Sequence, residues 1–143
     1  MKKIASSERV EFTKRFAVEI FKFDDDKRVF YGWASVVEKD GVEVVDLEGD
    51  VWSPDQMEET AWQFNVESRV GDEMHDEIQV SECVASIPFT KDLQQALGID
   101  LGLVGWLVGF RVSDDDSWDR VREFERPMLS IGGHGQRDPV IED

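Results

Sequence analysis

The stretch LVGWLVGFRV, residues 103–112, constrains the fold of this chain more than any other segment. Large apolar side chains share one face when the segment is extended: Val104, Trp106, Val108, Phe110 and Val112. A period of two over this length predicts a β-strand with one buried face. On the other face, Gly105 and Gly109 contribute no side chain. Glycines at this spacing favour the close approach of another backbone or a sharp bend of a barrel.

Other segments alternate in the same way. Residues 14–23 align Phe16, Val18 and Ile20, and residues 28–37 align Val29, Tyr31 and Trp33. The polar turn DDDK between these two segments predicts a hairpin. We expect a short strand near residues 44–46, after the turn EKDGVE, and longer strands at residues 80–89 and 127–133.

Three helices are predicted from the signals at their ends. Ser53 can cap the first helix, Pro54 suits its first turn, and Gln56 completes a capping box. Its core-facing residues recur at helical spacing: Met57, Ala61 and Phe64. Thr90 and Gly98 then mark the start and the end of a second, shorter helix.

The third helix is expected to begin at Ser113, because three aspartates follow it and carboxylates are favourable at a helix N-terminus. About six strands and three helices, without regular alternation, predict an α+β fold on a curled, mostly antiparallel sheet. A chain of 143 residues makes one domain. We expect a flexible N-terminal arm over residues 1–13 and the domain over residues 14–143.

The net charge restricts the partners of the domain. Sixteen Lys and Arg against 32 Asp and Glu give −16. Residues 1–30 carry eight basic and six acidic groups, so the surplus of negative charge belongs to residues 31–143. Such a surface repels nucleic acid and anionic membranes, which excludes binding through phosphates. A DNA mimic remains an alternative.

Cys83 is the only cysteine, so no disulfide can form within the chain and a reducing, intracellular origin is expected. Its apolar neighbours at alternate positions predict a buried structural thiol. The start of the chain lacks the apolar core of a signal peptide. No run reaches the roughly 18–20 apolar residues of a membrane helix, so we expect no membrane partner.

The segment MLSIGGHG carries the residues best suited to chemistry. Ser130 ends an apolar run, and Gly132 and Gly133 follow it, so their amides are unshielded by side chains and could receive an oxyanion. A serine hydroxyl needs a base, and the chain has only His75 and His134. His75 lies among carboxylates, which favour its protonated form, and one of them could orient the ring.

Four segments taken in order resemble the phage prohead (capsid maturation) proteases, and within them the XkdF-like branch of phage serine proteases. They are YGWASVVEKDGVEVVDLEGDVWSPDQMEETAWQF, SRVGDEMHDE, ALGIDLGLVGWLVGFRV and MLSIGGHG, from about Phe30 to Arg137. The resemblance implies a fold similar to the herpesvirus maturation protease, a closed or nearly closed β-barrel decorated by helices. It also implies a serine endopeptidase with His75 as base and Ser130 as nucleophile.

The third member of the triad is left open. It is a second histidine in the herpesvirus relatives, and an acidic residue is expected in the phage relatives. His134, Asp138 and Asp50 are the candidates in this chain. The chain ends 13 residues after Ser130, whereas family members usually continue with further strand. A shortened C-terminal end is therefore one expectation, and it would leave an inactive chain if the acid lay beyond it.

The resemblance implies phage scaffold and major capsid proteins as partners, inside the prohead in the host cytoplasm, and it permits a homodimer. The alternative function is an inactive structural component of the virion with the same fold. We expect no cofactor and no metal, because the chain lacks H-E-x-x-H and Cys/His ligand spacing. Asp46, Glu48 and Asp50 faintly resemble a calcium loop but lack its other ligands, so we interpret DLEGD as a turn.

Overall fold

The computed structural model describes residues 10–45, 49, 51–68, 81–123 and 128–137, and for residues 10–17, 68 and 128–137 it describes the backbone alone. In this part of the chain it contains strands, three α-helices and one π-helical turn. In chain order they are β1 (Val10–Asp24), β2 (Val29–Lys39), β3 (Val42–Glu43), α1 (Pro54–Gln63), η2 (Phe64–Ser68), β4 (Ser81–Phe89), α2 (Lys91–Leu97), β5 (Leu103–Val112), α3 (Asp115–Glu123) and β6 (Met128–Arg137).

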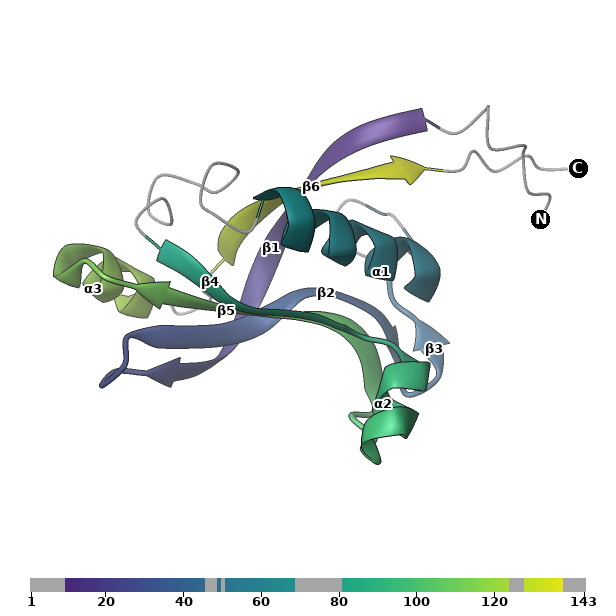
Figure 1. Cartoon of the computed structure of the whole chain (residues 1–143), viewed down its shortest axis with the longest axis horizontal. Helices are drawn as coiled ribbons and strands as arrows, with labels where there is room; N and C mark the ends of the chain where they lie inside the picture. The colour runs from purple at the N-terminus through teal and green to yellow at the C-terminus, as the bar shows by residue number, and fades with distance from the viewer. Residues whose placement is uncertain (1–9, 46–48, 50, 69–80, 124–127, 138–143) are drawn as a thin grey trace, which may run out of the picture.

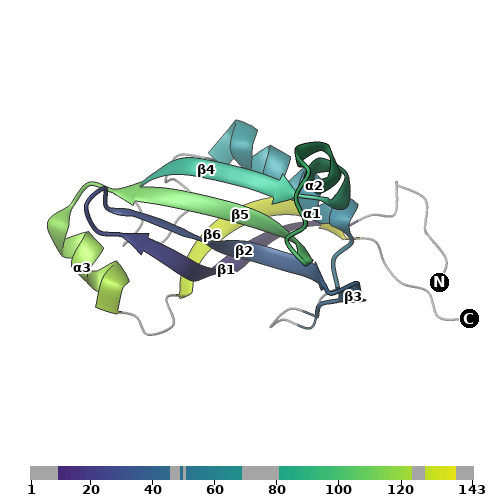
Figure 2. The same cartoon turned by 90° about the horizontal axis from the view of Figure 1, so that it is seen from below.

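The strands form one sheet in the order β4-β5-β2-β1-β6, with the short β3 paired to β2 (Figure 1). Every pairing between these strands is antiparallel. α2 and α3 lie at opposite ends of the sheet in both views (Figures 1 and 2). The predicted α+β class, the three helices and the antiparallel sheet are therefore confirmed.

The predicted closure into a barrel is wrong. β4 and β6 stand at the two ends of the strand order and do not pair with each other in the described residues. Instead α1 contacts both β4 and β6, and it also contacts β2 and β5. The helix thus lies against the face on which the two end strands would have to meet. The sheet is open and not strongly curled, because the contact between its ends runs through a helix rather than through strand hydrogen bonds.

The ends of α1 and α2 follow the sequence signals. The hydroxyl of Ser53 accepts a hydrogen bond from the Gln56 amide at 3.1 Å, and the Gln56 side chain accepts one from the Ser53 amide at 3.0 Å. The Thr90 hydroxyl accepts from the Leu93 amide at 3.2 Å. Gly98 ends α2 with φ at 70°, in the left-handed region that favours glycine. These caps are local, which explains why the sequence predicted them.

The third helix begins two residues later than predicted. α3 starts at Asp115, and the Asp114 carboxylate accepts hydrogen bonds from the Ser117 amide at 2.9 Å and the Ser117 hydroxyl at 2.8 Å. These two bonds are the main cause that lowers the pKa of Asp114. A charged acceptor serves the helix end better than a hydroxyl, so Asp114 takes the place that the sequence analysis gave to Ser113.

Trp106 lies at the centre of the core, on the face of β5 that the alternation predicted to be buried. Its side chain is fully buried, and its ring meets the edge of the Phe64 ring at a centroid distance of 5.4 Å. Its indole nitrogen donates to the hydroxyl of Ser86 in β4 at 2.9 Å. The buried apolar residues around it are Val18, Phe30, Ala34, Val37, Trp52, Met57, Ala61, Phe64, Val104, Val108, Phe110, Val112, Trp118 and Val121.

The opposite face of the sheet, here called the outer face, carries aromatic rings over the glycines of β5. A Cβ atom on Gly109 would lie 2.8 Å from the ring of Tyr31, and one on Gly105 would lie 3.1 Å from Trp33 and 2.9 Å from a backbone oxygen. The glycines therefore make room for rings of the chain's own β2. The predicted close approach of another backbone is confirmed at Gly105, where that backbone belongs to Ser35 of β2. The other predicted role, a bend of a barrel, is wrong because the sheet is open.

The turn before β3 is a two-residue hairpin turn. Asp40 and Gly41 both have positive φ, 52° and 80°, which is the type I′ pattern of an Asp-Gly pair. Lys39 consequently pairs directly with Val42, and β3 covers Val42–Glu43 instead of the predicted residues 44–46. β1 likewise starts earlier than expected, so residues 10–13 of the predicted arm belong to a strand.

Other side chains follow the predictions in part. Cys83 is half-buried against the core, and its thiol donates to the Ala85 carbonyl oxygen at 3.3 Å. Trp52, Trp106 and Trp118 are buried, whereas Trp62 is half exposed. None of the described helices is long and apolar enough to cross a membrane.

We expect Ser53→Ala to lower the free energy of unfolding by about 1 kcal/mol, because the Gln56 amide loses its acceptor. Urea denaturation measures the change. Ser53→Asp keeps an acceptor at the cap and is expected to retain the stability of the wild type. An equal loss in both variants would contradict a capping role.

We expect Gly109→Ala to lower the free energy of unfolding by about 1–3 kcal/mol, because the new methyl group overlaps the Tyr31 ring. The same substitution in a Tyr31→Ser background removes the overlapping ring and should cost clearly less. Thermal melts of the two pairs of proteins measure the difference. Equal costs in both backgrounds would show that the ring does not restrict this position.

Candidate functional site

The predicted nucleophile and its neighbours lie on β6. Ser130 pairs with Ala17 of β1, and His134 pairs with Thr13 further along the same two strands. Gly132 and Gly133 lie between them, inside the strand. The sequence predicts that this strand ends at residue 133, but the strand continues to residue 137. Ser130 therefore lies within a strand and not at its end.

The other predicted members of the site fall outside the described residues. His75 belongs to the segment between η2 and β4, Asp50 to the segment before α1, and Asp138 follows β6. The pairing of His75 with Ser130 and the choice among the candidates for the third member stay predictions.

The pairing of β6 determines the direction of its amides. The register with β1 runs from Met128 to Arg137 without a shift. In such a ladder, consecutive N–H groups point alternately toward the partner strand and away from it. The amides of Gly132 and Gly133 therefore point in opposite directions, whereas those of Ser130 and Gly132 point the same way. At most one of the two glycine amides can face away from β1.

The two end strands of the sheet differ in their surroundings. β4 carries Pro88 and a register irregularity near Val84, two features that discourage further pairing at a sheet edge. The side chain of Asn65 also donates to the Ser86 carbonyl oxygen of β4 at 3.2 Å. In the described part of the chain, β6 has a strand partner on one side only. The predicted nucleophile thus lies on an edge strand, where an extended peptide could align.

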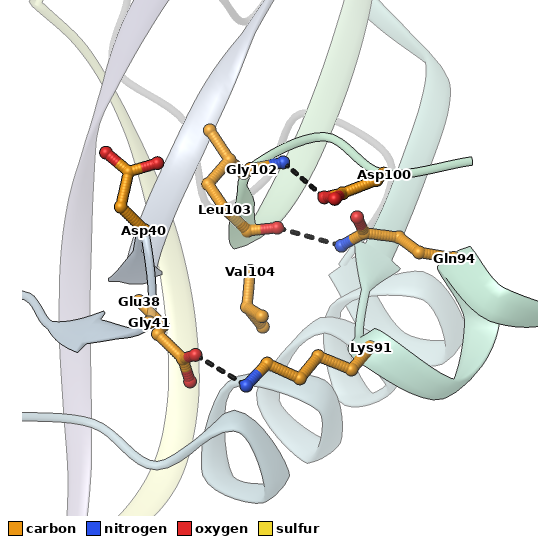
Figure 3. A pocket seen from close by; sticks show the side chains of 9 residues that line it. All are labelled: Glu38, Asp40, Gly41, Lys91, Gln94, Asp100, Gly102, Leu103 and Val104. Carbon is orange, nitrogen blue, oxygen red and sulfur yellow. Dashed lines mark hydrogen bonds and ion pairs between the residues drawn. The ribbon is translucent and has the colours of Figure 1, made fainter.

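A pocket of about 270 Å³ lies where β2, β5 and α2 meet (Figure 3). The Lys91 ammonium lies 2.7 Å from the Glu38 carboxylate, and the Asp100 carboxylate accepts from the Gly102 amide at 2.9 Å. The lining contains none of the predicted catalytic residues. Most of its polar groups bond to one another, and we therefore assign this pocket a structural role.

The side chain of Gln94 holds together the segments around this pocket. The side chain is buried, and its amide nitrogen donates to the carbonyl oxygens of Phe89 at 3.1 Å and Leu103 at 2.8 Å. Its oxygen accepts from the Leu101 amide at 2.9 Å. These three bonds join α2 to the segments before and after it. The sequence analysis missed Gln94, because a glutamine in a short polar helix carries no signal of burial.

Carboxylates gather near the N-terminal ends of α1 and α2. Partial burial raises the pKa of Glu58, and the negative charges of Asp55, Asp92 and Glu59 raise it further. Such a cluster suggests a cation site, but no group of His, Cys, Asp and Glu in the described residues is arranged to hold a metal ion. The cluster is therefore a source of repulsion between like charges.

We expect Glu58→Gln to raise the melting temperature at pH 7 by about 1–3 °C. A carboxyl group whose pKa is raised by folding binds its proton more tightly in the folded state, so stability falls as the pH rises through its titration. The gain should disappear at about pH 3, where the wild-type side chain is neutral in both states.

Thermal melts at the two pH values and in 0.5 M NaCl, which screens the repulsion, test this expectation. Glu43→Gln on β3 makes the same change of net charge away from the cluster and serves as the control. A gain that persists at low pH would contradict the electrostatic origin.

Comparison with known proteins identified one family. A family model described as "Putative phage serine protease XkdF" matches residues 17–138. The matched range includes every residue predicted for the site: Asp50, His75, Ser130, Gly132, Gly133, His134 and Asp138. No curated protein and no solved structure matched the chain.

Proposed function

Because the chain belongs to this family of phage serine proteases, we propose that it is an endopeptidase that cleaves scaffold and capsid precursors during prohead maturation. The observation that carries the proposal is the family match, which spans both Ser130 and His75. The reaction would take place inside the assembling prohead, in the host cytoplasm. The position of β6 supports the proposal, since in the described residues β6 pairs with a strand on one side only, and an extended precursor segment can align beside such a strand.

In the proposed reaction His75 takes the proton of the Ser130 hydroxyl as its oxygen attacks a peptide carbonyl carbon. The tetrahedral intermediate collapses when His75 returns the proton to the leaving amine. Water then attacks the acyl-enzyme with His75 again as base, which releases the second product and restores the serine. The steps balance with water as the only co-reactant, and no cofactor takes part.

The alternation of amides in β6 refines the proposed oxyanion site. Gly132 and Gly133 cannot both direct their amides to one oxygen while the ladder with β1 is regular. The amides of Ser130 and Gly132 point the same way, but in a regular strand they lie about 7 Å apart, too far for one oxygen to accept from both at about 3 Å. The proposal therefore takes one donor from the two glycine amides of β6 and the second donor from another segment. The absence of a side chain on Gly132 would then leave space for the carbonyl group of the substrate.

The third member would hold the His75 ring and stabilise its positive charge. His134 is on the same strand as Ser130, four residues along, which in an extended strand separates their Cα atoms by about 13 Å. A residue there can support His75 only if the base lies between the two. Asp138 and Asp50 remain the acidic candidates.

We expect a fluorophosphonate probe to label the wild-type protein at Ser130, because only an activated serine reacts readily with such a phosphorus centre. Ser130→Ala should remove the labelling completely, and His75→Gln should slow it by at least about 1,000-fold. Mass spectrometry of the intact protein and of its peptides measures the extent and the position of labelling. This assay needs no knowledge of the natural substrate.

Ser53→Ala removes a hydroxyl from a helix cap and serves as the control, since its labelling should equal that of the wild type. Coexpression with the scaffold and major capsid proteins of the same phage then tests the substrates, because cleavage should stop with Ser130→Ala. A folded wild-type protein that neither reacts with the probe nor cleaves these precursors would favour the alternative, an inactive structural component of the virion.

A further inference from the structure

Three aromatic rings form a continuous row across the outer face of the sheet. The Phe21 ring of β1 lies 5.7 Å from the Trp33 ring of β2, and Trp33 lies 6.5 Å from the Phe89 ring of β4, measured between centroids. We call these three residues the aromatic row. The row can cross β5 because Gly105, below Trp33, has no side chain.

The aromatic row and its neighbours are accessible. Phe21 is 54% exposed, Trp33 and Phe89 are partly exposed, and Ile87, which pairs with Leu107 beside the row, is 37% exposed. Figure 2 looks onto this face, and no described helix lies in front of the middle of β5, β2 and β1. A contiguous exposed group of large apolar side chains is typical of a surface that contacts another molecule.

The strand register places Trp33, the middle of the aromatic row, near the predicted nucleophile. Trp33 pairs with Glu19 of β1, and Ala17, two residues away on β1, pairs with Ser130 of β6. Two strand spacings across the sheet and two residues along it separate the Cα atoms of Trp33 and Ser130 by about 12 Å. An extended peptide covers this distance with three or four residues.

The charges around the aromatic row favour some kinds of bound segment over others. The Arg111 guanidinium pairs with the Glu82 carboxylate at 2.6 Å, and the Lys22 ammonium lies 5.9 Å from the centre of the Tyr31 ring. The outer face therefore carries basic as well as acidic groups, while the whole chain carries −16. An acidic segment, and a second copy of this acidic chain, are repelled at long range, whereas a neutral or basic segment is not.

We propose that the aromatic row binds large apolar side chains of a neutral or basic precursor segment, three or four residues from the bond that Ser130 cleaves. This inference rests on the proposed protease function and adds the class of substrate. Apolar side chains of the segment would cover Phe21 and Ile87, and Trp33 would form the middle of the contact.

The experiment profiles cleavage in a library of peptides from a digested proteome, with the cleaved bonds identified by mass spectrometry. The wild-type protein should cleave sites with Phe, Leu, Ile or Met at a fixed position three or four residues from the bond. Phe21→Ser should lower kcat/KM for such peptides by about 10-fold and leave cleavage of peptides with a small residue there unchanged. Ile87 lies on β4, about 19 Å from β6, so Ile87→Ser should lower kcat/KM only for longer peptides with a second apolar residue about six positions from the bond. Leu97→Ser changes an equally exposed side chain on α2 and should keep the wild-type profile.

The possible outcomes distinguish the proposed role of the aromatic row from the proposed protease function. Cleavage that depends on Ser130 but shows no apolar preference, or a preference that Phe21→Ser and Ile87→Ser leave intact, overturns the role of the aromatic row and keeps the protease. The lack of any cleavage that depends on Ser130 overturns both. A dimer in sedimentation equilibrium that Phe21→Ser converts to a monomer would show that a second copy covers the row, and would overturn substrate binding there. Thermal melts confirm that the variants are folded.

Discussion

The contact of Trp106 with Phe64 and Ser86 holds the two layers of this protein together. The indole ring joins β5 to the helical segment that follows α1, and its N–H group joins β5 to β4. A buried indole N–H without an acceptor would cost about 1–3 kcal/mol, so the hydroxyl of Ser86 adds to the stabilisation that the apolar packing provides. Met57 and Ala61 of α1 belong to the same buried cluster, so α1 also packs against the sheet. Among the described residues, this packing divides the sheet into a face covered by α1 and a face that no helix covers.

The division into two faces determines where function can lie. On the covered face, α1 contacts the strands at both ends of the order, so the sheet stays open and β6 remains an edge strand. On the uncovered face, Tyr31 and Trp33 lie over the glycines of β5 and fill what would otherwise be gaps in the surface. The packing of α1 on one face of the sheet therefore accounts for two features. It leaves the edge that carries Ser130, and it leaves the opposite face for the aromatic rings.

From the sequence, the candidate site could be predicted only as residue types and their order along the chain, without the directions of their backbone groups. Ser130 before two glycines, together with a histidine among carboxylates, indicated nucleophile and base, and the family match agrees with the class of enzyme. The sequence analysis assigned both glycine amides to the oxyanion, because spacing along the chain says nothing about which way an amide points. The direction became evident only from the regular pairing of β6 with β1.

By itself the sequence determined the features that depend on neighbours in the chain. The capping box at Ser53, the left-handed Gly98 and the buried alternation through Trp106 all arise within a few residues, and all were predicted. Tertiary structure alone decided that the sheet stays open and that the face of Tyr31 and Trp33 is the outer one. Alternation tells which side chains share a face, but which face is buried depends on where a distant helix packs. Closure of a sheet likewise depends on contacts between its first and last strands, which no local pattern encodes.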